Sequence, residues 1–500
     1  MFGMSTVCSV LLTACAVAAP AQTVQKVIDE FLQAQGGKKA LAQIRTETLA
    51  GSLIEESSGR TGSWSLITRT PNRFYLEIIA GPDRTVEAFN GMSAWGQNSP
   101  EAAGTLTGEA AKEAEASGRY WNNRFADPDK SRLTVQMVGI EKVRGRDAYH
   151  VQAQPGPGIT REVFFDARTH LIVREAPKAG EQIDYADYRP VNGIQMPFRL
   201  EVHLGGQAGG HEYKVTVTRA ELNARVDDSV FDFPNAPGTK LPDIADLIRE
   251  VSKNQKAVDE MQKEYTCHLT TEETKTGPKG AIVTKIREFE VFNIAGDEVR
   301  HLLATDGAAL SGKEKTKEDE RFNKEFQERT KEAARLAADP KKQARQDAED
   351  EAQISDFLRA ERFSNPRRER FRGEDVIAVD FGPNPDYKPK KAIESYLQKL
   401  TGVVLIDDKA HDVARLEAHV DNSIKIGGGV LASLDKGSSF VFEQGRINDE
   451  VWLPSYTEVH VAGHALLFVK LKANEIDRYT DYKKFHSDSK IAGIDDQGIR

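Results

Sequence analysis

The chain has 500 residues, of which 39% are hydrophobic and 29% are charged. This length is too great for one ordinary hydrophobic core and predicts two large domains. The modest apolar fraction excludes a bundle of membrane helices. A formal net charge of −9 disfavours nucleic acid as a partner, because no overall basic field attracts phosphate groups.

An apolar segment near the start has the length and flanks of a secretory signal. It runs over residues 7–19, is too short to anchor in a bilayer, and precedes the small-residue sequence Ala19-Pro20-Ala21. Residues 1–21 are therefore expected to be a signal peptide that directs the protein to the periplasm. The sequence Leu12-Thr13-Ala14-Cys15 also has the pattern of a lipoprotein box, so Cys15 is a lipidation candidate that would anchor the chain at the outer membrane. A plain cleaved signal is the alternative.

The cysteines allow little covalent chemistry. Cys8 and Cys15 lie in the leader, which leaves Cys267 alone in the mature chain. No internal disulfide and no cysteine-based zinc site is therefore expected. Cys267 admits an interpretation as a nucleophile, but its surroundings lack an activated thiol loop and favour a half-buried strand residue.

The first half begins with helical periodicity and continues with alternation. Apolar residues within 24–32 recur at helical spacing, and Gly36-Gly37 would cap that helix. Over residues 46–94, apolar and polar residues alternate between turn residues, which indicates consecutive antiparallel strands. A helical stretch over 108–120 and further strands over 133–217 follow.

The second half has the same order of patterns. A helix is predicted over residues 241–261, and strands begin near Thr266. The charged segment 313–362 is interrupted at Asp339-Pro340 and predicts two solvated helices. Its scattered apolar residues would form a side that docks on the sheet.

Short motifs recur in the same order in both halves. Val143-Arg144-Gly145-Arg146-Asp147 matches Phe371-Arg372-Gly373-Glu374-Asp375. Three further pairs keep this order: Asn90-Gly91 with Asp306-Gly307, Phe165-Asp166 with Ile406-Asp407, and Met196-Pro197 with Leu453-Pro454. Each match is short, but their common order predicts a tandem duplication.

A curved antiparallel sheet interrupted by a helical excursion leaves a concave inner face that the helix would cover as a lid. Alternation places every second strand residue on that face. The apolar candidates for lining it are Trp64, Leu66, Phe74, Leu76, Ile78 and Trp95. A packed core and an open greasy pocket are both compatible with these residues.

The first half resembles the periplasmic lipoprotein-carrier family, the LolA/LolB-like proteins of outer membrane lipoprotein sorting. Four motifs carry the resemblance: Gly62-Ser63-Trp64, the run 68–74 ending in Pro71-Asn72-Arg73-Phe74, the run 89–95, and Phe231-Asp232-Phe233-Pro234. The second half looks like a more distant copy, through residues 305–307, 402–407 and 452–454.

This resemblance implies an α+β fold of two tandem, unclosed antiparallel β-barrel domains, each with an opening helix and a helical lid insertion. It assigns the first domain to residues 22–238 and the second to 239–500. The implied cavity shields acyl chains from water during transit across the periplasm. In the family, an arginine directly before the Pro-Asn pair holds the lid closed; here that position is Thr70, and Arg69 is the lid-holding candidate.

Motifs for catalysis or cofactor binding are weak. His460 and His464 have the spacing of a metal pair, but on a strand they would lie roughly 13 Å apart, too far for one ion. The glycine-rich stretches at 205–210 and 427–429 lack the Lys-Ser/Thr ending of a phosphate loop. We therefore expect no metal, no cofactor and no enzymatic activity.

Two functions compete at this stage. The first is a non-enzymatic periplasmic protein that holds a lipid, the acyl chains of a lipoprotein or another hydrophobic ligand, with peripheral membrane contact. The second is an envelope scaffold whose cavities are filled by side chains and whose charged helices bind a protein partner. A continuous apolar cavity would favour the first function, and bulky side chains filling the inner faces would favour the second.

Overall fold

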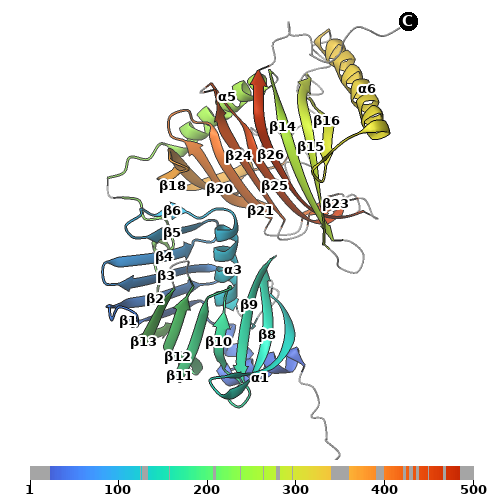
Figure 1. Ribbon diagram of the computed structural model, residues 1–500. Helices are drawn as coiled ribbons and strands as arrows, with labels where there is room; N and C mark the ends of the chain where they lie inside the picture. Colours follow the sequence, from blue (N-terminus) through green and yellow to red (C-terminus); the bar gives the residue numbers. More distant parts are fainter. Residues whose placement is uncertain are drawn as a thin grey trace, which may run out of the picture.

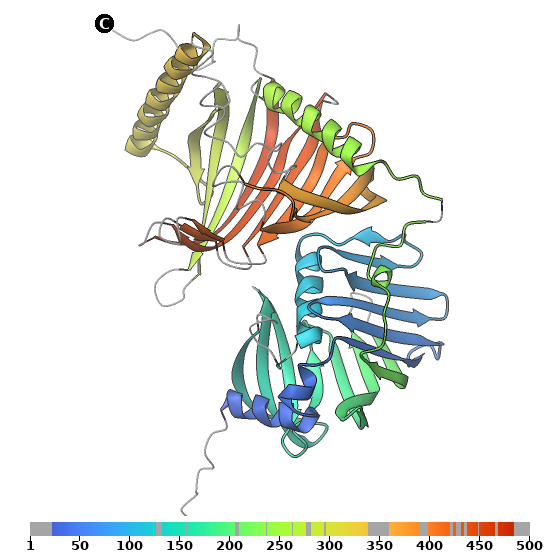
Figure 2. The ribbon, with the colours of Figure 1, turned by 180° about the vertical axis from the view of Figure 1, so that it is seen from behind.

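The computed structural model describes residues 23–123, 125–126, 133–156, 158–205, 210–236, 238–262, 264–276, 282–294, 297–338, 360–389, 399–420, 424–426, 432–434, 438–448, 450–465 and 469–484. The expected signal peptide, Cys15 and part of the charged segment 313–362 lie outside these residues. Figure 1 shows two curved sheets, one built from each half of the chain, and Figure 2 shows them from behind.

The first half contains helices α1 (Val24–Gln35), α2 (Lys38–Leu41), α3 (Glu109–Asn123) and the short helix η1 (Asp228–Val230). Its strands are β1 (Thr46–Glu55), β2 (Thr61–Arg69), β3 (Arg73–Ala80), β4 (Asp83–Phe89), β5 (Ala94–Asn98), β6 (Gly104–Thr105), β7 (Thr134–Val143), β8 (Arg146–Gly156), β9 (Ile159–Asp166), β10 (Ile172–Ala176), β11 (Gln182–Val191), β12 (Ile194–Leu204) and β13 (His211–Leu222).

The first sheet is antiparallel, with the order β6-β5-β4-β3-β2-β1-β13-β12-β11-β10-β9-β8-β7. The end strands β6 and β7 are not paired with each other in the described part of the sheet. The sheet is therefore curved but unclosed. Helix α3 lies in the opening, where it contacts β2–β5 on one side and β8 on the other.

The second half contains helices α5 (Ile244–Gln262) and α6 (Gly312–Ala337). Its strands are β14 (Tyr265–Thr276), β15 (Ile282–Ile294), β16 (Asp297–Thr305), β17 (Ala308–Ala309), β18 (Glu361–Phe371), β19 (Glu374–Pro383), β20 (Leu400–Asp407), β21 (Val413–Val420), β22 (Ile424–Ile426), β23 (Ala432–Leu434), β24 (Ser439–Ile447), β25 (Val451–Ala465) and β26 (Val469–Lys484). The order is β17-β16-β15-β14-β26-β25-β24-β21-β20-β19-β18, with β22 and β23 paired beside β25.

The predicted fold class is confirmed: each half is an unclosed antiparallel sheet with an opening helix and a helical insertion. The strands of the two halves also correspond one to one over a long stretch. The run from β7 to β13 has the same neighbours as the run β18-β19-β20-β21-β24-β25-β26. Three of the four repeated motif pairs therefore occupy equivalent places, whereas Asn90-Gly91 follows the fourth strand of its half and Asp306-Gly307 the third.

The Arg-Gly motifs form equivalent two-residue hairpin turns. Arg144 and Gly145 connect β7 to β8 with φ values of 50° and 79°, and Arg372 and Gly373 connect β18 to β19 with 49° and 92°. Two positive φ angles in succession define the turn whose twist matches that of the flanking strands. The glycine supplies one of these angles at no steric cost.

The two aspartates at the ends of β9 and β20 also build the same turn. Asp166 accepts hydrogen bonds from the backbone N–H groups of the residues two and three positions later, and so does Asp407. Each turn ends in a histidine with positive φ, His170 or His411. Each histidine then contacts a glutamate of the opening helix of its own half.

A third equivalent feature is a carboxylate held between two arginines on the outer face of each sheet. Asp184 on β11 is contacted by Arg144 at 2.9 Å and by Arg174 at 2.6 Å. Glu443 on β24 is contacted by Arg372 at 2.9 Å and by Arg415. Such side-chain agreement between distant segments supports descent of both halves from one duplicated unit.

The opening helices cover one end of the inner face. Phe31 of α1 packs edge-on against Phe165 of β9, with the ring centroids 5.1 Å apart. In the second half, Leu247 and Val251 of α5 pack on a cluster from β19, β20 and β21. The two insertions differ, because α6 packs mainly on β15 and β16, where Phe322 contacts Phe292.

Candidate ligand-binding cavities

The inner face of the first sheet encloses a cavity of about 940 Å³. Its walls come from β1–β3 on one side and from β11–β13 on the other, with α3 as the roof. Alternation explains the apolar lining, because every second residue of these strands points inward. The apolar lining residues include Leu49, Trp64, Leu66, Leu76, Ile78, Val202 and Tyr213.

Four of the six residues singled out in the sequence, Trp64, Leu66, Leu76 and Ile78, line this cavity. Phe74 points to the same side but lies beyond the cavity at the end of β3, where its ring meets the ring of Trp121 on α3 edge-on at 4.9 Å.

Trp95 lies on the opposite face of the sheet. Its position in the ladder pairs it with Ala88, whereas the cavity residue Leu76 pairs with Glu87 one residue along. The indole of Trp95 donates a hydrogen bond to the carbonyl of Phe231 at 2.9 Å and packs on Phe233. Trp95 therefore binds the segment that follows β13, on the outer face of the first sheet.

Helix α3 fits tightly onto the ends of the strands. A Cβ atom at Gly118 would lie 2.1 Å from the carbonyl oxygen of Asn72, so only glycine allows this approach. Asn122 of α3 donates a hydrogen bond to the carbonyl of Arg73 at 2.9 Å. Packing at these points sets the distance of the roof from the sheet.

Arg161 on β9 ties the roof to the opposite wall. Its side chain is 2% exposed and donates hydrogen bonds to Glu113 at 2.7 Å and to Ser117 at 2.6 Å, both on α3. The guanidinium also lies over the rings of Tyr120 and Trp121 at 5.1 and 5.9 Å. Arg161 thus joins α3 to β9 through buried polar contacts.

Arg69, the lid-holding candidate from the sequence, lies elsewhere. It contacts Asp228 and donates a hydrogen bond to the carbonyl of Val226 at 3.1 Å, so it binds the segment after β13 and not α3. The sequence did contain a signal for Arg161. It shares the inward side of β9 with Ile159 and Val163, where a charged residue requires a buried partner.

Charged side chains gather at one side of the main cavity. Besides Arg161 and Glu113, the lining includes Glu87, Lys178 and Glu181. Lys178 forms an ion pair with Glu181 at 3.0 Å. Burial raises the pKa of Glu87, and the positive charge of Lys178 opposes part of this shift.

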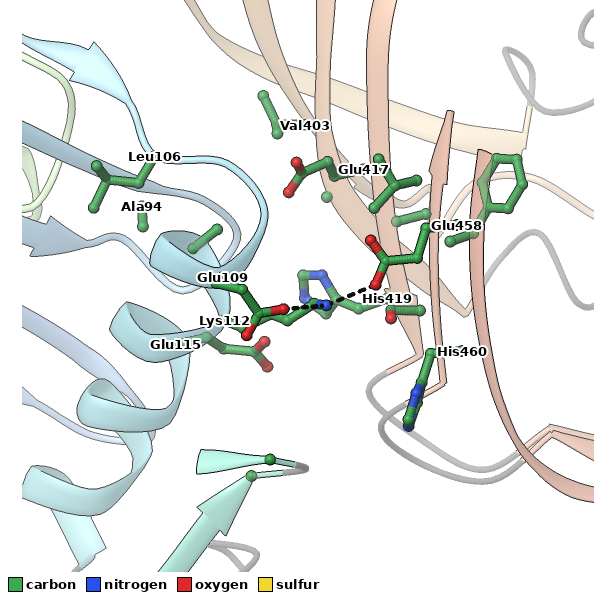
Figure 3. Close-up of a pocket in the computed structure, with 18 of the residues that line it drawn as sticks. Ala94, Leu106, Glu109, Lys112, Glu115, Val403, Glu417, His419, Glu458 and His460 are labelled. Atoms are coloured by element: carbon green, nitrogen blue, oxygen red, sulfur yellow. Dashed lines mark hydrogen bonds and ion pairs between the residues drawn. The ribbon is translucent and has the colours of Figure 1, made fainter. Parts of the chain in front are cut away.

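A second cavity, of about 370 Å³, lies where α3 meets the outer face of the second sheet (Figure 3). Lys112 of α3 contacts Glu109 at 2.9 Å and Glu458 of β25 at 3.1 Å. The backbone N–H of Gly108 donates a hydrogen bond to Glu417 of β21 at 2.9 Å. Helix α3 is thus a wall shared by both cavities.

His460 lies at the margin of this junction cavity. Burial lowers its pKa, and the positive charge of Lys112 lowers it further, so the imidazole is neutral at pH 7. In the described part of the chain, no group of three or more His, Cys, Asp or Glu side chains is arranged to hold a metal ion.

Two further observations concern chemistry and membranes. Cys267 is buried in β14, and burial raises the pKa of its thiol to about 12, so it is a poor nucleophile. Among the helices of the described residues, none combines the length and the apolar character that crossing a bilayer requires.

Comparison with known proteins gives matches in structure. No family model matches the chain, and no curated protein matches it in sequence. A DUF1329 family protein from Desulfovibrio piger is 12% identical, matches 42% of this chain and 98% of its own, and has a TM-score of 0.30. A putative outer membrane lipoprotein-sorting protein domain from Vibrio parahaemolyticus is 10% identical, with 41% and 94% covered and a TM-score of 0.28.

A LolA superfamily protein from Nitrosomonas europaea is 11% identical, with 42% of this chain and 98% of that chain covered and a TM-score of 0.29. Each of these three matches covers about two fifths of this chain and nearly the whole of the solved structure.

Proposed function

We propose that the first half is a non-enzymatic binding module that encloses the hydrocarbon part of an amphiphile, either a lipid or the acyl chain of a lipoprotein, in the main cavity. The observation that carries this proposal is the open apolar space under α3. Its volume lies within the range of small-molecule pockets, about 300–1,000 Å³. An inner face filled by side chains, as the scaffold function requires, would leave no such space.

The energetics of such a site need no covalent step. Each buried CH2 group contributes about 0.8 kcal/mol, so ten methylene groups would contribute about 8 kcal/mol before the entropic cost of association. The roof helix is joined to the sheet by buried polar contacts, in which Arg161 of β9 binds Glu113 and Tyr120 donates a hydrogen bond to Glu175 at 2.7 Å. Opening of this helix would admit a chain.

The proposal includes a periplasmic location, which the leader motif supports, with outer-membrane attachment through Cys15 as one form of it. The domain limits 22–238 and 239–500 belong to the same proposal. The second half would then hold the roof helix from outside, through Glu417 and Glu458, and offer α6 to a partner in the envelope.

The proposal is tested by native mass spectrometry of the full mature chain purified from its own envelope fraction, followed by lipid extraction. We expect a bound amphiphile in the wild type and its loss in Leu76→Trp, because the larger side chain fills the cavity. Ile140→Trp is the matched control, since Ile140 is 63% exposed on β7. A wild-type protein that remains free of ligand after incubation with mixed lipids would refute the carrier function.

A further inference from the structure

One carboxylate at the charged side of the main cavity has no oppositely charged partner among the described residues. Arg161 is neutralised by Glu113, and Lys178 by Glu181, in ion pairs of 2.7 and 3.0 Å. Glu87 is left over. It has no hydrogen bond or ion pair with any described residue, although all four of these charges influence it.

The position of Glu87 directs its carboxyl group at the ligand space. On β4 it pairs with the cavity residue Leu76 of β3 and with Gly96 of β5, so the three positions share the inner face. Gly96 has no side chain to cover its neighbour, and Glu87 itself lines the cavity. The apolar wall continues from Leu76 on β3 to Trp64 and Leu66 on β2, two strands away from Glu87.

A half-buried carboxylate without a partner is costly, because water is partly removed and nothing replaces it. The raised pKa of Glu87 reflects this cost. A ligand that brings one positive charge to this point would remove it, and the geometry provides an apolar space for a chain directly beside it. A neutral ligand would leave the carboxyl unmatched, and an anionic ligand would be repelled.

We propose that the amphiphile bound in the main cavity carries a single cationic group, of the primary-amine class, which forms an ion pair with Glu87. This inference rests on the proposed function, since it names the head group of the same ligand. It makes Glu87 a specificity-determining residue.

The experiment is competitive displacement of a neutral fluorescent apolar probe from the full mature chain, in the presence of salt, by dodecylamine, dodecanol and dodecanoate. The three competitors share one chain length and differ in head-group charge. We expect dodecylamine to bind roughly tenfold more tightly than dodecanol, because a charge-assisted hydrogen bond is added, and dodecanoate to bind least tightly.

In Glu87→Gln, the amine and the alcohol should bind equally, and the thermal stability should be retained because an unmatched charge is removed. Glu141→Gln is the control, since Glu141 is exposed on β7, lies outside the cavity lining and carries the same charge. It should keep the tenfold preference.

Three other outcomes would contradict the inference, and they distinguish its failure from the failure of the proposed function. If dodecanol and dodecylamine compete equally in the wild type, the cavity binds chains without selecting an amine, and only the inference fails. The same holds if Glu141→Gln abolishes the preference as fully as Glu87→Gln does, because the effect is then general attraction to an acidic protein. If none of the three displaces the probe, the proposed function itself fails.

Discussion

Glu361, at the start of β18, is a buried carboxyl group without support. Its side chain is 3% exposed, and neither oxygen has a hydrogen-bond partner in the described structure. Burial raises the pKa of Glu361 to about 8. The folded state therefore prefers the neutral acid, whereas an unfolded chain ionises near pH 4.3.

This difference gives a pH dependence with a defined sign. The contribution of Glu361 to stability is fully present below its unfolded pKa and is lost as the pH rises through about 8. Glu361→Gln should remove this loss. We expect the free energy of unfolding of the variant to rise relative to that of the wild type from pH 4 to pH 8, by roughly 3–4 kcal/mol at pH 7.

Denaturant unfolding at several pH values measures this difference in the free energy of unfolding. Glu374→Gln, at an exposed position of the same hairpin, should follow the wild-type curve. A constant difference between Glu361→Gln and wild type across this pH range would show that the carboxyl is solvated in the folded state.

At the scale of elements, the roof helix α3 depends on Arg161. Arg161→Met keeps much of the apolar bulk but removes the hydrogen bonds to Glu113 and Ser117. We expect a bound neutral fluorescent apolar probe to dissociate about tenfold faster, which stopped-flow displacement would detect. Arg189→Met, at an exposed arginine of β11, should leave the rate unchanged. An unchanged rate in Arg161→Met would mean that the helix does not open for release.

The close contact of α3 with the sheet gives a second prediction. Gly118→Ala would force the helix away from the carbonyl of Asn72, because the added Cβ meets it at 2.1 Å. We expect a loss of about 1–3 kcal/mol in the free energy of unfolding. Gly139→Ala is the comparison, since nothing lies within 4 Å of a Cβ at that position. Equal stability of both variants would contradict the tight fit.

Local sequence patterns predicted where strands and turns lie better than they predicted which strands and side chains contact one another. Alternation located the strands, and the Arg-Gly turns marked equivalent hairpins because positive φ angles are required there. The inward side of Trp64 was within reach of the sequence. The side of Trp95 was not, because it depends on how β5 aligns with β4, which is set by tertiary pairing. The partner of Arg161 lies 44 residues away on a helix, beyond any local signal.

At the scale of the whole molecule, the two halves are joined by a buried ion pair. Arg367 and Asp380 are 1% and 0% exposed and lie 2.8 Å apart in the second half. Asn90 of the first half donates a hydrogen bond to Asp380 at 2.9 Å, and Arg367 donates one to Thr105 at 2.9 Å. A change at this pair should therefore affect both halves.

Asp380→Asn would leave the charge of Arg367 buried without its carboxylate. We expect a loss of roughly 3–5 kcal/mol in the free energy of unfolding, with faster proteolysis between the halves. Asp375→Asn removes an exposed carboxylate from the same strand and should cost less than about 1 kcal/mol. Similar small losses in both variants, measured by denaturant unfolding, would show that the junction is solvated.

The bond between Glu369 and the backbone N–H of Thr105, at 2.6 Å, has a consequence for aggregation. Thr105 belongs to β6 and Glu369 to β18, which are terminal strands of the two open sheets. A terminal strand presents unpaired amide groups that invite pairing with another chain. Here the carboxylate of Glu369 accepts a hydrogen bond from one such N–H group, and the neighbouring half blocks the approach of another strand. Each half therefore shields an exposed border of the other, so a single domain produced alone should self-associate more readily than the full chain.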